Sequence, residues 1–219
     1  MKIDAAFFPK EMTEDLAEET GLHLGDGSMN FYNGKGLYQL RGHITDDKSH
    51  YIFRIKLLYK RLFNIDVNVR DMSSTGVCGF QIWSDELVYF KRKTLGLPLG
   101  PKHDFLVPSV IAENDKFSRS FLRGYFDTDG CLYLENKRGK LYPRIEMYSI
   151  SERFIRQLQE IIFRLGFRVT FEKRDNSKYG WSDGYRLSIR GIAMTKKWFS
   201  EITPANPKHI NKFKKLNLE

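Results

Sequence analysis

Several short segments of the chain alternate apolar and polar residues with a period of two. In residues 28–32, Met29 and Phe31 fall on one side and polar residues on the other, and Leu132 and Leu134 repeat this pattern in residues 131–135. Successive side chains of a β-strand point to opposite faces, so the pattern predicts strands with one apolar face and one polar face. Similar alternation predicts six further strands, near residues 39–43, 67–70, 81–83, 142–146, 169–172 and 186–188.

Two longer segments, 49–67 and 151–169, have the signals of helices. Ser149 to Glu152 form a capping box, and Asp46 or Asp47 is a candidate cap for the first copy. Asn64 and Gly166 are residue types that readily end a helix in the left-handed conformation. We therefore expect one helix between the two strand pairs of each half.

The chain repeats itself once, at a period of about a hundred residues. ETGLHLGDGSM (19–29) aligns with LRGYFDTDGCL (122–132), and Arg41 aligns with Arg144 at the same shift. The helical segments, GFQI (79–82) with GYRL (184–187), and PKH (101–103) with PKH (207–209) follow in the same order. The repeat predicts two similar halves, 1–110 and 111–219, joined through a linker near residues 108–116.

Each repeat begins with a helix that ends in an Asp-Gly turn. Gly21 and Gly25 lie four residues apart in the first helix, and Gly124 and Thr128 do so in the second. Small residues at this spacing share one helix face and let two helix backbones approach closely. We expect the two helices to pack side by side at the junction of the halves.

This packing would bring two carboxylates together, those of Asp26 and Asp129 at the helix C-termini. Neighbouring carboxylates repel unless a cation lies between them, and a helix C-terminus also favours a cation. Mg²⁺, a hard divalent ion, suits oxygen ligands of this kind. A metal clamped on a phosphate can activate water and stabilise the leaving oxygen.

The composition limits the class of partner. Lys and Arg number 36 against 27 Asp and Glu, a net charge of +9, which predicts nucleic acid or an acidic membrane surface as the partner. The apolar runs are far shorter than the roughly 20 residues of a membrane-spanning helix, and the N-terminal segment turns acidic, unlike a secretory signal. Cys78 and Cys131 form neither a metal-binding spacing nor a disulfide framework. We expect a cytoplasmic, nucleoid-associated or organellar protein that is not secreted.

The segment LRGYFDTDG (122–130) closely resembles the motif of the LAGLIDADG endonucleases. The first copy is weaker and has Leu24 where the motif has its earlier Asp, a residue that is not the metal ligand in that family; it keeps Gly21, Leu22, Asp26 and Gly27. The resemblance runs from about residue 14 to residue 212. It implies the α/β class in its α+β form, with two pseudo-symmetric αββαββα halves whose four-stranded antiparallel sheets form a saddle over DNA.

The resemblance also implies a function, that of a free-standing homing endonuclease active as a monomer. Such an enzyme cuts both strands of a long, asymmetric DNA target by metal-activated hydrolysis of phosphodiesters and needs no protein partner. Two or three Mg²⁺ ions would be shared between Asp26 and Asp129, and Gly25 and Thr128 would complete the metal site.

Two lysines complete the implied catalytic set. Lys102, in Gly-Pro-Lys, matches the Gly-x-Lys context in which the family places a lysine by the scissile phosphate. Lys208 matches it through the repeat but lacks the glycine. A lysine there offsets developing charge or polarises the attacking water.

The polar sheet faces are expected to read the DNA, because Arg pairs with guanine edges and Gln or Asn with adenine edges in the major groove. A twisted antiparallel sheet follows that groove as a β-ribbon does. The candidate DNA-binding residues are Ser28, Asn30, Tyr32, Gln39, Arg41, His43, Asn68, Arg70, Gln81, Trp83, Tyr133, Glu135, Tyr142, Arg144, Glu146, Thr170, Glu172, Arg186 and Ser188. If these residues only hold phosphates, sequence selection would fall to the loops 72–78 and 178–183.

Two alternatives use the same fold. An RNA maturase that assists intron splicing would need a second basic surface away from the sheets. A DNA-binding regulator that has lost cleavage would be expected to lack a motif acid, whereas both Asp26 and Asp129 are present.

Overall fold

The order of elements repeats along the chain, and each half is built as αββαββα. The computed structural model describes residues 3–176, 180 and 182–216. A short 3₁₀ turn, η1 (Ala5–Phe7), precedes the first half. The first half consists of α1 (Glu14–Asp26), β1 (Gly27–Tyr32), β2 (Lys35–His43), a helix formed by α2 (Lys48–His50), η2 (Tyr51–Ile55) and α3 (Lys56–Phe63), β3 (Arg70–Met72), the turn η3 (Ser73–Thr75), β4 (Val77–Trp83), and a helix formed by α4 (Asp85–Tyr89) and η4 (Phe90–Thr94).

The second half follows the same plan and adds one helix at its end. Its elements are α6 (Asp115–Asp129), β5 (Gly130–Lys137), β6 (Lys140–Ser149), α7 (Glu152–Arg164), β7 (Thr170–Arg174), β8 (Gly184–Arg190), α8 (Ile192–Glu201) and α9 (Pro207–Lys214). The segment expected as a linker, 108–116, is largely helical, because it contains α5 (Ser109–Ala112) and the start of α6. The Asn114 side chain caps α6 by accepting from two backbone N–H groups of its first turn.

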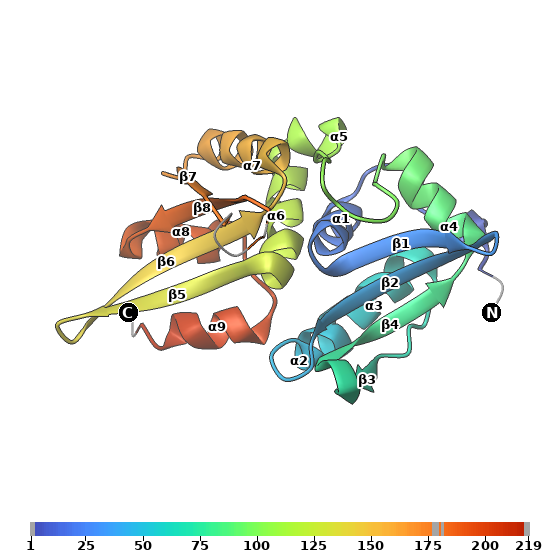
Figure 1. Ribbon diagram of the computed structural model, residues 1–219, viewed down its shortest axis with the longest axis horizontal. Coiled ribbons are helices and arrows are strands. Elements are labelled where there is room, and N and C mark those ends of the chain that lie inside the picture. Colours follow the sequence, from blue (N-terminus) through green and yellow to red (C-terminus); the bar gives the residue numbers. More distant parts are fainter. Residues whose placement is uncertain (1–2, 177–179, 181, 217–219) are drawn as a thin grey trace.

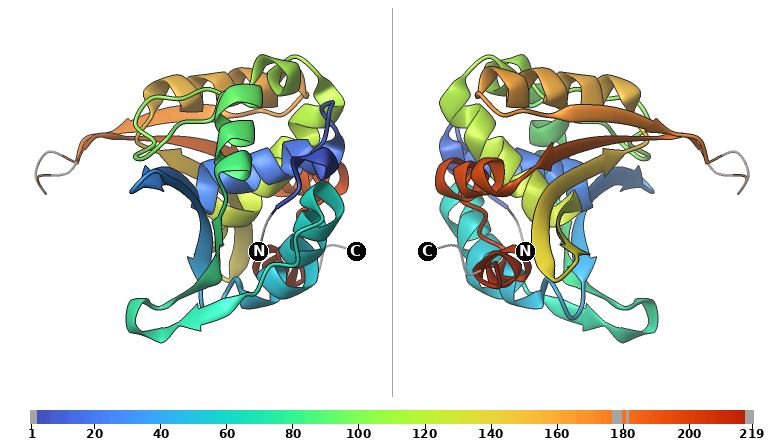
Figure 2. Two further views of the ribbon diagram at one scale, coloured as in Figure 1. Left: turned by 90° about the vertical axis from the view of Figure 1, so that its right-hand side faces the viewer. Right: turned by 90° about the vertical axis from the view of Figure 1, so that its left-hand side faces the viewer.

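Each half contains one four-stranded antiparallel sheet, and the two strand orders correspond. The orders are β1-β2-β4-β3 and β5-β6-β8-β7. The outer strands β3 and β7 extend as two arms, and the inner strands lie recessed between them, as the turned views show (Figure 2). The expected α+β architecture and its concave double sheet are therefore confirmed.

Helices α1 and α6 lie side by side at the centre, between the two sheets (Figure 1). A Cβ added at Gly21 would meet the Phe121 carbonyl oxygen at 2.2 Å, and one at Gly124 would meet the Glu18 carbonyl oxygen at 2.0 Å. Neither contact is sterically possible, so these glycines allow the close approach of the backbones. The packing expected from the four-residue spacing is confirmed.

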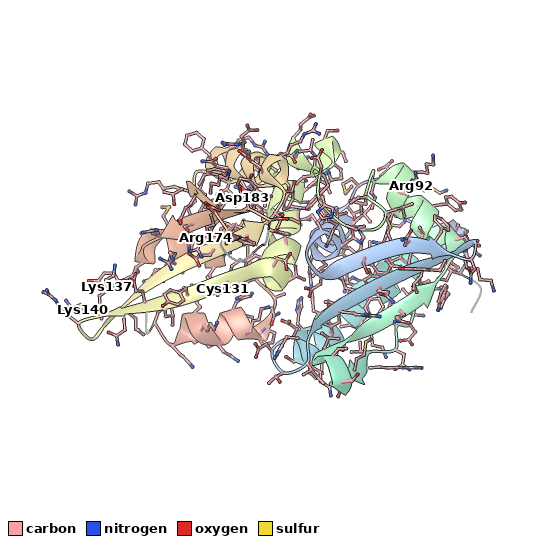
Figure 3. All side chains as sticks on the ribbon, viewed as in Figure 1. Arg92, Cys131, Lys137, Lys140, Arg174 and Asp183 are labelled. Atoms are coloured by element: carbon pink, nitrogen blue, oxygen red, sulfur yellow. The ribbon has the colours of Figure 1, made fainter. Side chains whose placement is uncertain are left out.

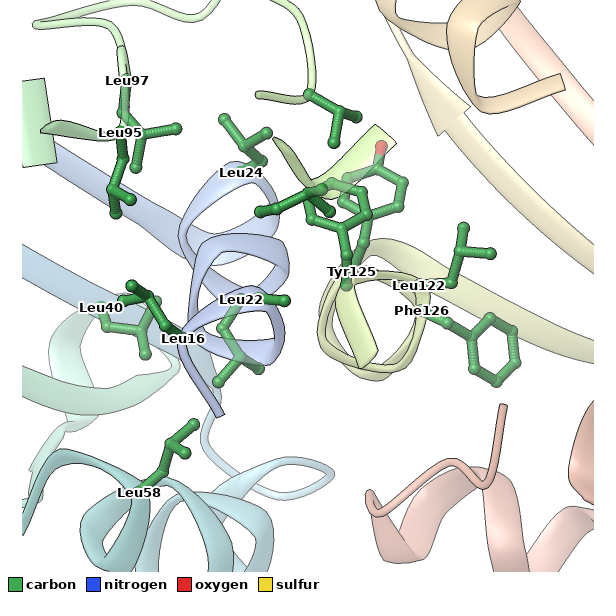
Figure 4. Close-up of a cluster of buried hydrophobic side chains, with 14 of the residues drawn as sticks. Leu16, Leu22, Leu24, Leu40, Leu58, Leu95, Leu97, Leu122, Tyr125 and Phe126 are labelled. Atoms are coloured by element: carbon green, nitrogen blue, oxygen red, sulfur yellow. The ribbon is translucent and has the colours of Figure 1, made fainter. Parts of the chain in front are cut away.

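Apolar side chains on both sides of the central helix pair belong to one buried cluster that extends through both halves. Leu16 and Leu40 lie on one side of the helix pair, and Leu122 and Phe126 lie on the other (Figure 4). All four are at most 2% exposed. The pair of helices is thus both the interface between the halves and the centre of the buried cluster.

The sheet registers correct two details of the repeat. Gly27 pairs with Leu40 and Gly130 pairs with Met147, so the hairpin from β5 to β6 is four residues longer than its counterpart. Arg41 is consequently equivalent to Tyr148 rather than to Arg144, and the expected alignment was wrong. Likewise the fourth strands correspond at a shift of 107, because the registers equate positions 77–83 with 184–190, so the alignment of GFQI with GYRL was wrong by two residues.

The helix signals are mostly confirmed. Asn64 ends α3 with φ 53°, and Gly166, just beyond α7, has φ 79°. In the second half the cap is Ser151, whose hydroxyl accepts from the Phe154 N–H at 3.4 Å, rather than Ser149. Asp47 has the cap position before α2 but makes no capping hydrogen bond with its side chain. In the part of the chain that the structure describes, no helix has the length and apolar character to cross a membrane.

Candidate active site and sheet surface

The two motif carboxylates lie next to each other, where α1 and α6 end. Asp26 and Asp129 are the last residues of these helices. The Cγ of Asp129 lies 3.5 Å from the point that a Cβ on Gly25 would occupy, and the Thr128 hydroxyl oxygen lies only 2.0 Å from it. The Thr128 hydroxyl donates back to carbonyls of its own helix, so the contact between the helix ends stays close. The sequence predicted this neighbourhood, and the structure contains it.

Asp26 is half-buried and has a crowded acidic environment. The Tyr51 hydroxyl donates to its Oδ2 at 3.1 Å. Burial, then the charge of Asp129 and then that of Asp47, raise the pKa of Asp26 to about 7. The anion is therefore unfavourable without a cation, which is the condition expected of a metal ligand.

Asp129 differs because its outer side is open to solvent. Packing behind the carboxyl group raises its pKa, whereas the charges of Lys102 and Lys208 lower it. Solvent on the exposed side of Asp129 weakens the rise in pKa that the packing causes. Asp129 is therefore the more readily ionised of the two acids.

Lys102 reaches the site from a loop. Its ammonium donates to the carbonyl oxygens of His23 at 3.1 Å, of Leu24 at 2.8 Å and of Gly25, at the C-terminus of α1. Gly100 has φ 71°, and its N–H donates to the Met29 carbonyl at 2.9 Å, which fixes the loop against β1. The glycine of the Gly-x-Lys pattern thus makes the turn that delivers Lys102.

Lys208 reaches the equivalent place from the first turn of a helix. It lies in α9, its ammonium donates to the Thr128 carbonyl at 3.3 Å, and it forms an ion pair of 2.9 Å with Asp47. The buried Asn206 caps α9 and donates to Asp47 Oδ1 at 2.7 Å and to the Asp127 carbonyl at 2.9 Å. A helix start replaces the glycine turn, which explains why this copy needs no glycine.

Each helix C-terminus therefore carries one lysine and one aspartate. Ammonium groups on the last carbonyls of a helix are favoured because these carbonyls lack partners within the helix and form the negative end of its dipole. The carbonyls of Gly25 and Thr128, expected beside the metal, accept from Lys102 and Lys208. A cation that used these carbonyls would compete with the lysines for them.

The donor set still fits a hard divalent cation. Within the described ranges no three His, Cys, Asp or Glu side chains are grouped to hold a metal ion. Mg²⁺ is commonly bound by one or two carboxylates, with water and substrate phosphates completing its shell. Asp26 and Asp129 meet this requirement only if a phosphate contributes the remaining ligands.

Asp47 is the functional candidate that the sequence assigned to another role. It was considered only as a helix cap, but its carboxylate accepts from Asn206 and pairs with Lys208, and its charge raises the pKa of both motif acids. It lies in the connection between β2 and α2, whereas its partners lie more than 150 residues later. No spacing within the sequence signalled this contact.

The polar face of the N-terminal sheet contains the residues expected there. A pocket of about 330 Å³ is lined by Ser28, Asn30, Tyr32 and Gln39, and another of about 460 Å³ by Asn68, Arg70, Gln81 and Trp83. Arg41 and His43 follow Gln39 at every second position of β2.

The C-terminal sheet places its expected residues on one face as well, and many of them pair with each other. Arg144 lies over the Tyr133 ring, Glu135 pairs with Lys137, and Lys137 lies over the Tyr142 ring. Glu146, Glu172 and Arg186 form ion pairs, and the Thr170 hydroxyl donates to the Ser188 carbonyl. Ser188 is an exception, because at 3% exposed it does not present its hydroxyl to a ligand.

Six residues on this second face were missed: Cys131, Lys137, Lys140, Tyr148, Arg174 and Arg190. Continuing the period-two alternation by one step along each strand would have found them. Of the alternative loop 178–183, residues 178, 179 and 181 lie outside the described part of the chain.

Comparison with known proteins agrees with this geometry. Residues 116–203 match the family model described as a LAGLIDADG-like domain. The homing endonuclease I-DmoI in complex with DNA and Ca has the same fold with a TM-score of 0.62, at 15% identity, over 92% of this chain and 97% of that one. The LAGLIDADG meganuclease I-AabMI bound to uncleaved DNA gives a TM-score of 0.56 at 11% identity, over 94% and 91% of the two chains.

Two proteins of Methanocaldococcus jannaschii are similar in sequence. An isomerizing glutamine–fructose-6-phosphate aminotransferase is 24% identical over 83% of this chain, and the ATP-dependent DNA helicase Hel308 is 32% identical over 37% of it. The matches span only 15% and 7% of the lengths of these relatives. Their names describe unrelated activities, so neither name transfers to this chain.

Residues 116–203 of the chain are therefore similar to a LAGLIDADG-like domain. Its two halves together have the fold of the two-domain LAGLIDADG homing endonucleases.

Proposed function

We propose that this protein is a site-specific DNA endonuclease that cuts both strands of a long asymmetric target. The observation that carries the proposal is the pair of carboxylates at the adjacent ends of α1 and α6, each with a lysine beside it. The site lies at the junction of two polar sheet faces. Relatives of this fold are described as homing endonucleases bound to DNA.

Asp26 and Asp129 are the residues that would hold divalent ions, with Mg²⁺ as the proposed cofactor. When bound, such ions lower the pKa of the attacking water and offset charge on the scissile phosphate. Structures of relatives are described with Mn, Ca and Mg. Because the protein supplies few ligands itself, we expect tight metal binding only when DNA is present.

The remaining residues of the site have defined tasks in this mechanism. The Tyr51 hydroxyl orients the Asp26 carboxylate. Lys102 and Lys208 exchange their carbonyl partners for phosphate oxygens and stabilise the developing negative charge. Asn206 and Asp47 hold Lys208 in place. Each half would act on one strand, which makes the two-half division at about residue 110 a functional division as well.

The test is a cleavage-site selection on a library of randomised DNA duplexes with Mg²⁺. Wild-type protein is expected to cut a single family of sequences, and Asp26→Asn and Asp129→Asn are expected to lose double-strand cleavage by at least about 1000-fold while still binding DNA. Asp15→Asn and Asp115→Asn change an aspartate in the first turn of the same two helices and serve as controls.

Cleavage of both strands at the wild-type rate by Asp129→Asn would show that the site is assigned wrongly. Sequence-selective binding without any cleavage by the wild type would instead support the regulator. The maturase stays an alternative, and tight binding of structured RNA by a protein with altered sheet faces would favour it.

A further inference from the structure

The polar face of the C-terminal sheet carries a chain of alternating charges. Glu146 Oε1 lies 2.9 Å from Arg144 Nε and 2.8 Å from Arg186 Nη1. The second Nη of Arg186 pairs with Glu172 on the neighbouring strand. Arg174, labelled in Figure 3, extends the chain through a contact of 3.8 Å with Glu172.

The centre of this chain is held firmly. The side chains of Arg186, Glu146 and Arg144 are 12%, 19% and 20% exposed, far less than is usual for such residues on an open sheet. The Arg144 guanidinium also lies 5.0 Å from the centre of the Tyr133 ring. Long charged side chains lose much rotamer freedom when they are fixed in this way, so the cost of ordering them falls on folding rather than on DNA binding.

The pairing leaves hydrogen-bonding capacity unused. Among the described residues, Nε of Arg144, Nε of Arg186 and Oε1 of Glu146 have no hydrogen-bond partner, because the close contacts are not aligned as hydrogen bonds. The arginines are attracted to Glu146 but are not fully satisfied by it. They can therefore exchange part of this contact for an acceptor on a ligand.

The N-terminal face differs in kind. Its expected base-contacting residues include Gln39, Gln81, Arg41 and Arg70, and none of that set is a carboxylate. On a surface that faces DNA, a carboxylate reduces the attraction to phosphates that drives binding to any sequence. The acids of the C-terminal face thus oppose non-specific binding while they orient the arginines.

We propose that Glu146 and Glu172 determine sequence specificity in the C-terminal half. Their carboxylates hold the guanidinium groups of Arg144 and Arg186 in an orientation suited to contact guanine. They also offset positive charge that would otherwise attract a duplex of any sequence. The target is thus guanine-containing under the C-terminal sheet, whereas the amide-rich N-terminal face suits adenine. This inference rests on the proposed function and adds the base chemistry of one half of the target.

In the experiment, duplexes that bind the protein are selected from a randomised library in a buffer that contains Ca²⁺. The selection is run with the wild-type protein and, separately, with Glu146→Gln. The wild type is expected to enrich guanines in one half of the recovered site. Glu146→Gln should bind unselected duplexes about threefold more tightly, because one repulsive charge is gone. Its preference for the selected sequence over a scrambled duplex should fall about tenfold, with the loss confined to that half of the site.

Glu152→Gln is the matched control. Glu152 also pairs with an arginine, Arg156, at 2.6 Å, but it lies in helix α7. This variant is expected to keep the base preferences of the wild type. If Glu146→Gln fails to fold, Glu172→Gln tests the same point, because Glu172 is 47% exposed and its loss disturbs the fold less.

The outcomes separate this inference from the proposed function. Unchanged base preferences in both glutamate variants, from a wild type that selects and cuts one sequence, would overturn only the specificity role. Equal losses on selected and scrambled duplexes for Arg186→Ala would also overturn it, since Arg186 would then merely hold phosphate. A wild type that selects no sequence would sink both proposals together.

Discussion

The two halves share one backbone plan but differ in chemistry at four equivalent buried positions. In the N-terminal half, the fully buried Lys91 ammonium lies 2.5 and 2.6 Å from the two carboxylate oxygens of Glu19. The Tyr59 hydroxyl donates to Glu19, and the Tyr38 hydroxyl oxygen lies 2.7 Å from that of Tyr59. In the C-terminal half, the structurally equivalent positions hold Leu122, Ile145, Ile161 and Trp198, each at most 2% exposed.

The comparison shows that the fold requires neither a buried ion pair nor apolar side chains at these four positions. A buried ion pair gains attraction in a poorly polarisable interior but loses the hydration of both charges, so it is often no better than apolar residues of similar volume. The Lys91 ammonium also lies 4.5 Å from the centre of the Tyr38 ring, which adds a favourable contact. The cluster of Glu19, Lys91, Tyr38 and Tyr59 is therefore sensitive to the loss of any one member, whereas the four equivalent apolar side chains depend mainly on packing volume.

The largest effect is expected from breaking the buried pair on one side. Lys91→Met should lower the free energy of unfolding by about 3–5 kcal/mol, because Glu19 is left buried without its counter-charge. Chemical denaturation followed by circular dichroism measures the change.

The double variant Glu19→Leu with Lys91→Met sharpens this test. It gives the N-terminal core an apolar pair like that of the other half, so it should be more stable than Lys91→Met alone. A double variant that is less stable than the single one would mean that the pair contributes net stability and that the two cores are not interchangeable.

An intermediate effect is expected from the two lysines of the site. Lys102→Met and Lys208→Met should each slow cleavage about 10- to 100-fold, because each removes a positive group near the reacting phosphate. Single-turnover cleavage of a selected duplex, followed separately for each strand, gives the rates.

The halves should differ in how these lysines are supported. Asp47→Asn removes the ion-pair partner of Lys208, whereas Lys102 contacts only carbonyls. The loss of the Asp47 charge reaches both motif acids, so both strands should be affected, but the strand whose rate depends on Lys208 should slow more. Lys212→Met changes an exposed lysine on the same helix and is the control. Equal slowing of both strands by Asp47→Asn would contradict this asymmetry.

The last comparison of the two motif acids concerns stability and pH. The pKa of Asp26 is raised to about 7 in the folded protein, against about 3.9 when unfolded. Between these values the folded state binds more protons than the unfolded state, so the contribution of Asp26 to stability falls as pH rises from about 4 to about 7.

Without metal and DNA at pH 8, Asp26→Asn should therefore melt at a higher temperature than the wild type, and the difference should vanish near pH 4. Asp129→Asn should raise the melting temperature less, because Lys102 and Lys208 already offset the charge of Asp129 in the wild type. Thermal melts across this pH range measure these differences in melting temperature. An increase for Asp129→Asn as large as that for Asp26→Asn would show that the two acids are equivalent.

The sequence by itself determined the repeat, the strands and the central helix contact. Each depends on residues that are close along the chain: strands alternate with a period of two, and Gly21 and Gly25 mark a helix face that tolerates close approach. Asp26, Asp129 and the two lysines followed from the same local signals, aided by the family resemblance. Local spacing is conserved on folding, so the predicted strands and the contact between the central helices are confirmed. The catalytic roles of the four site residues stay predictions.

Only the tertiary structure decided the equivalences between the halves and the partners of the buried charges. The four extra residues of one hairpin moved Arg41 away from Arg144, and no local pattern reveals where such residues are inserted. Asp47 meets Lys208, and Glu19 meets Lys91, across separations of 161 and 72 residues. These contacts form because folding brings distant elements together in a desolvated interior, where an unpaired charge is too costly to persist.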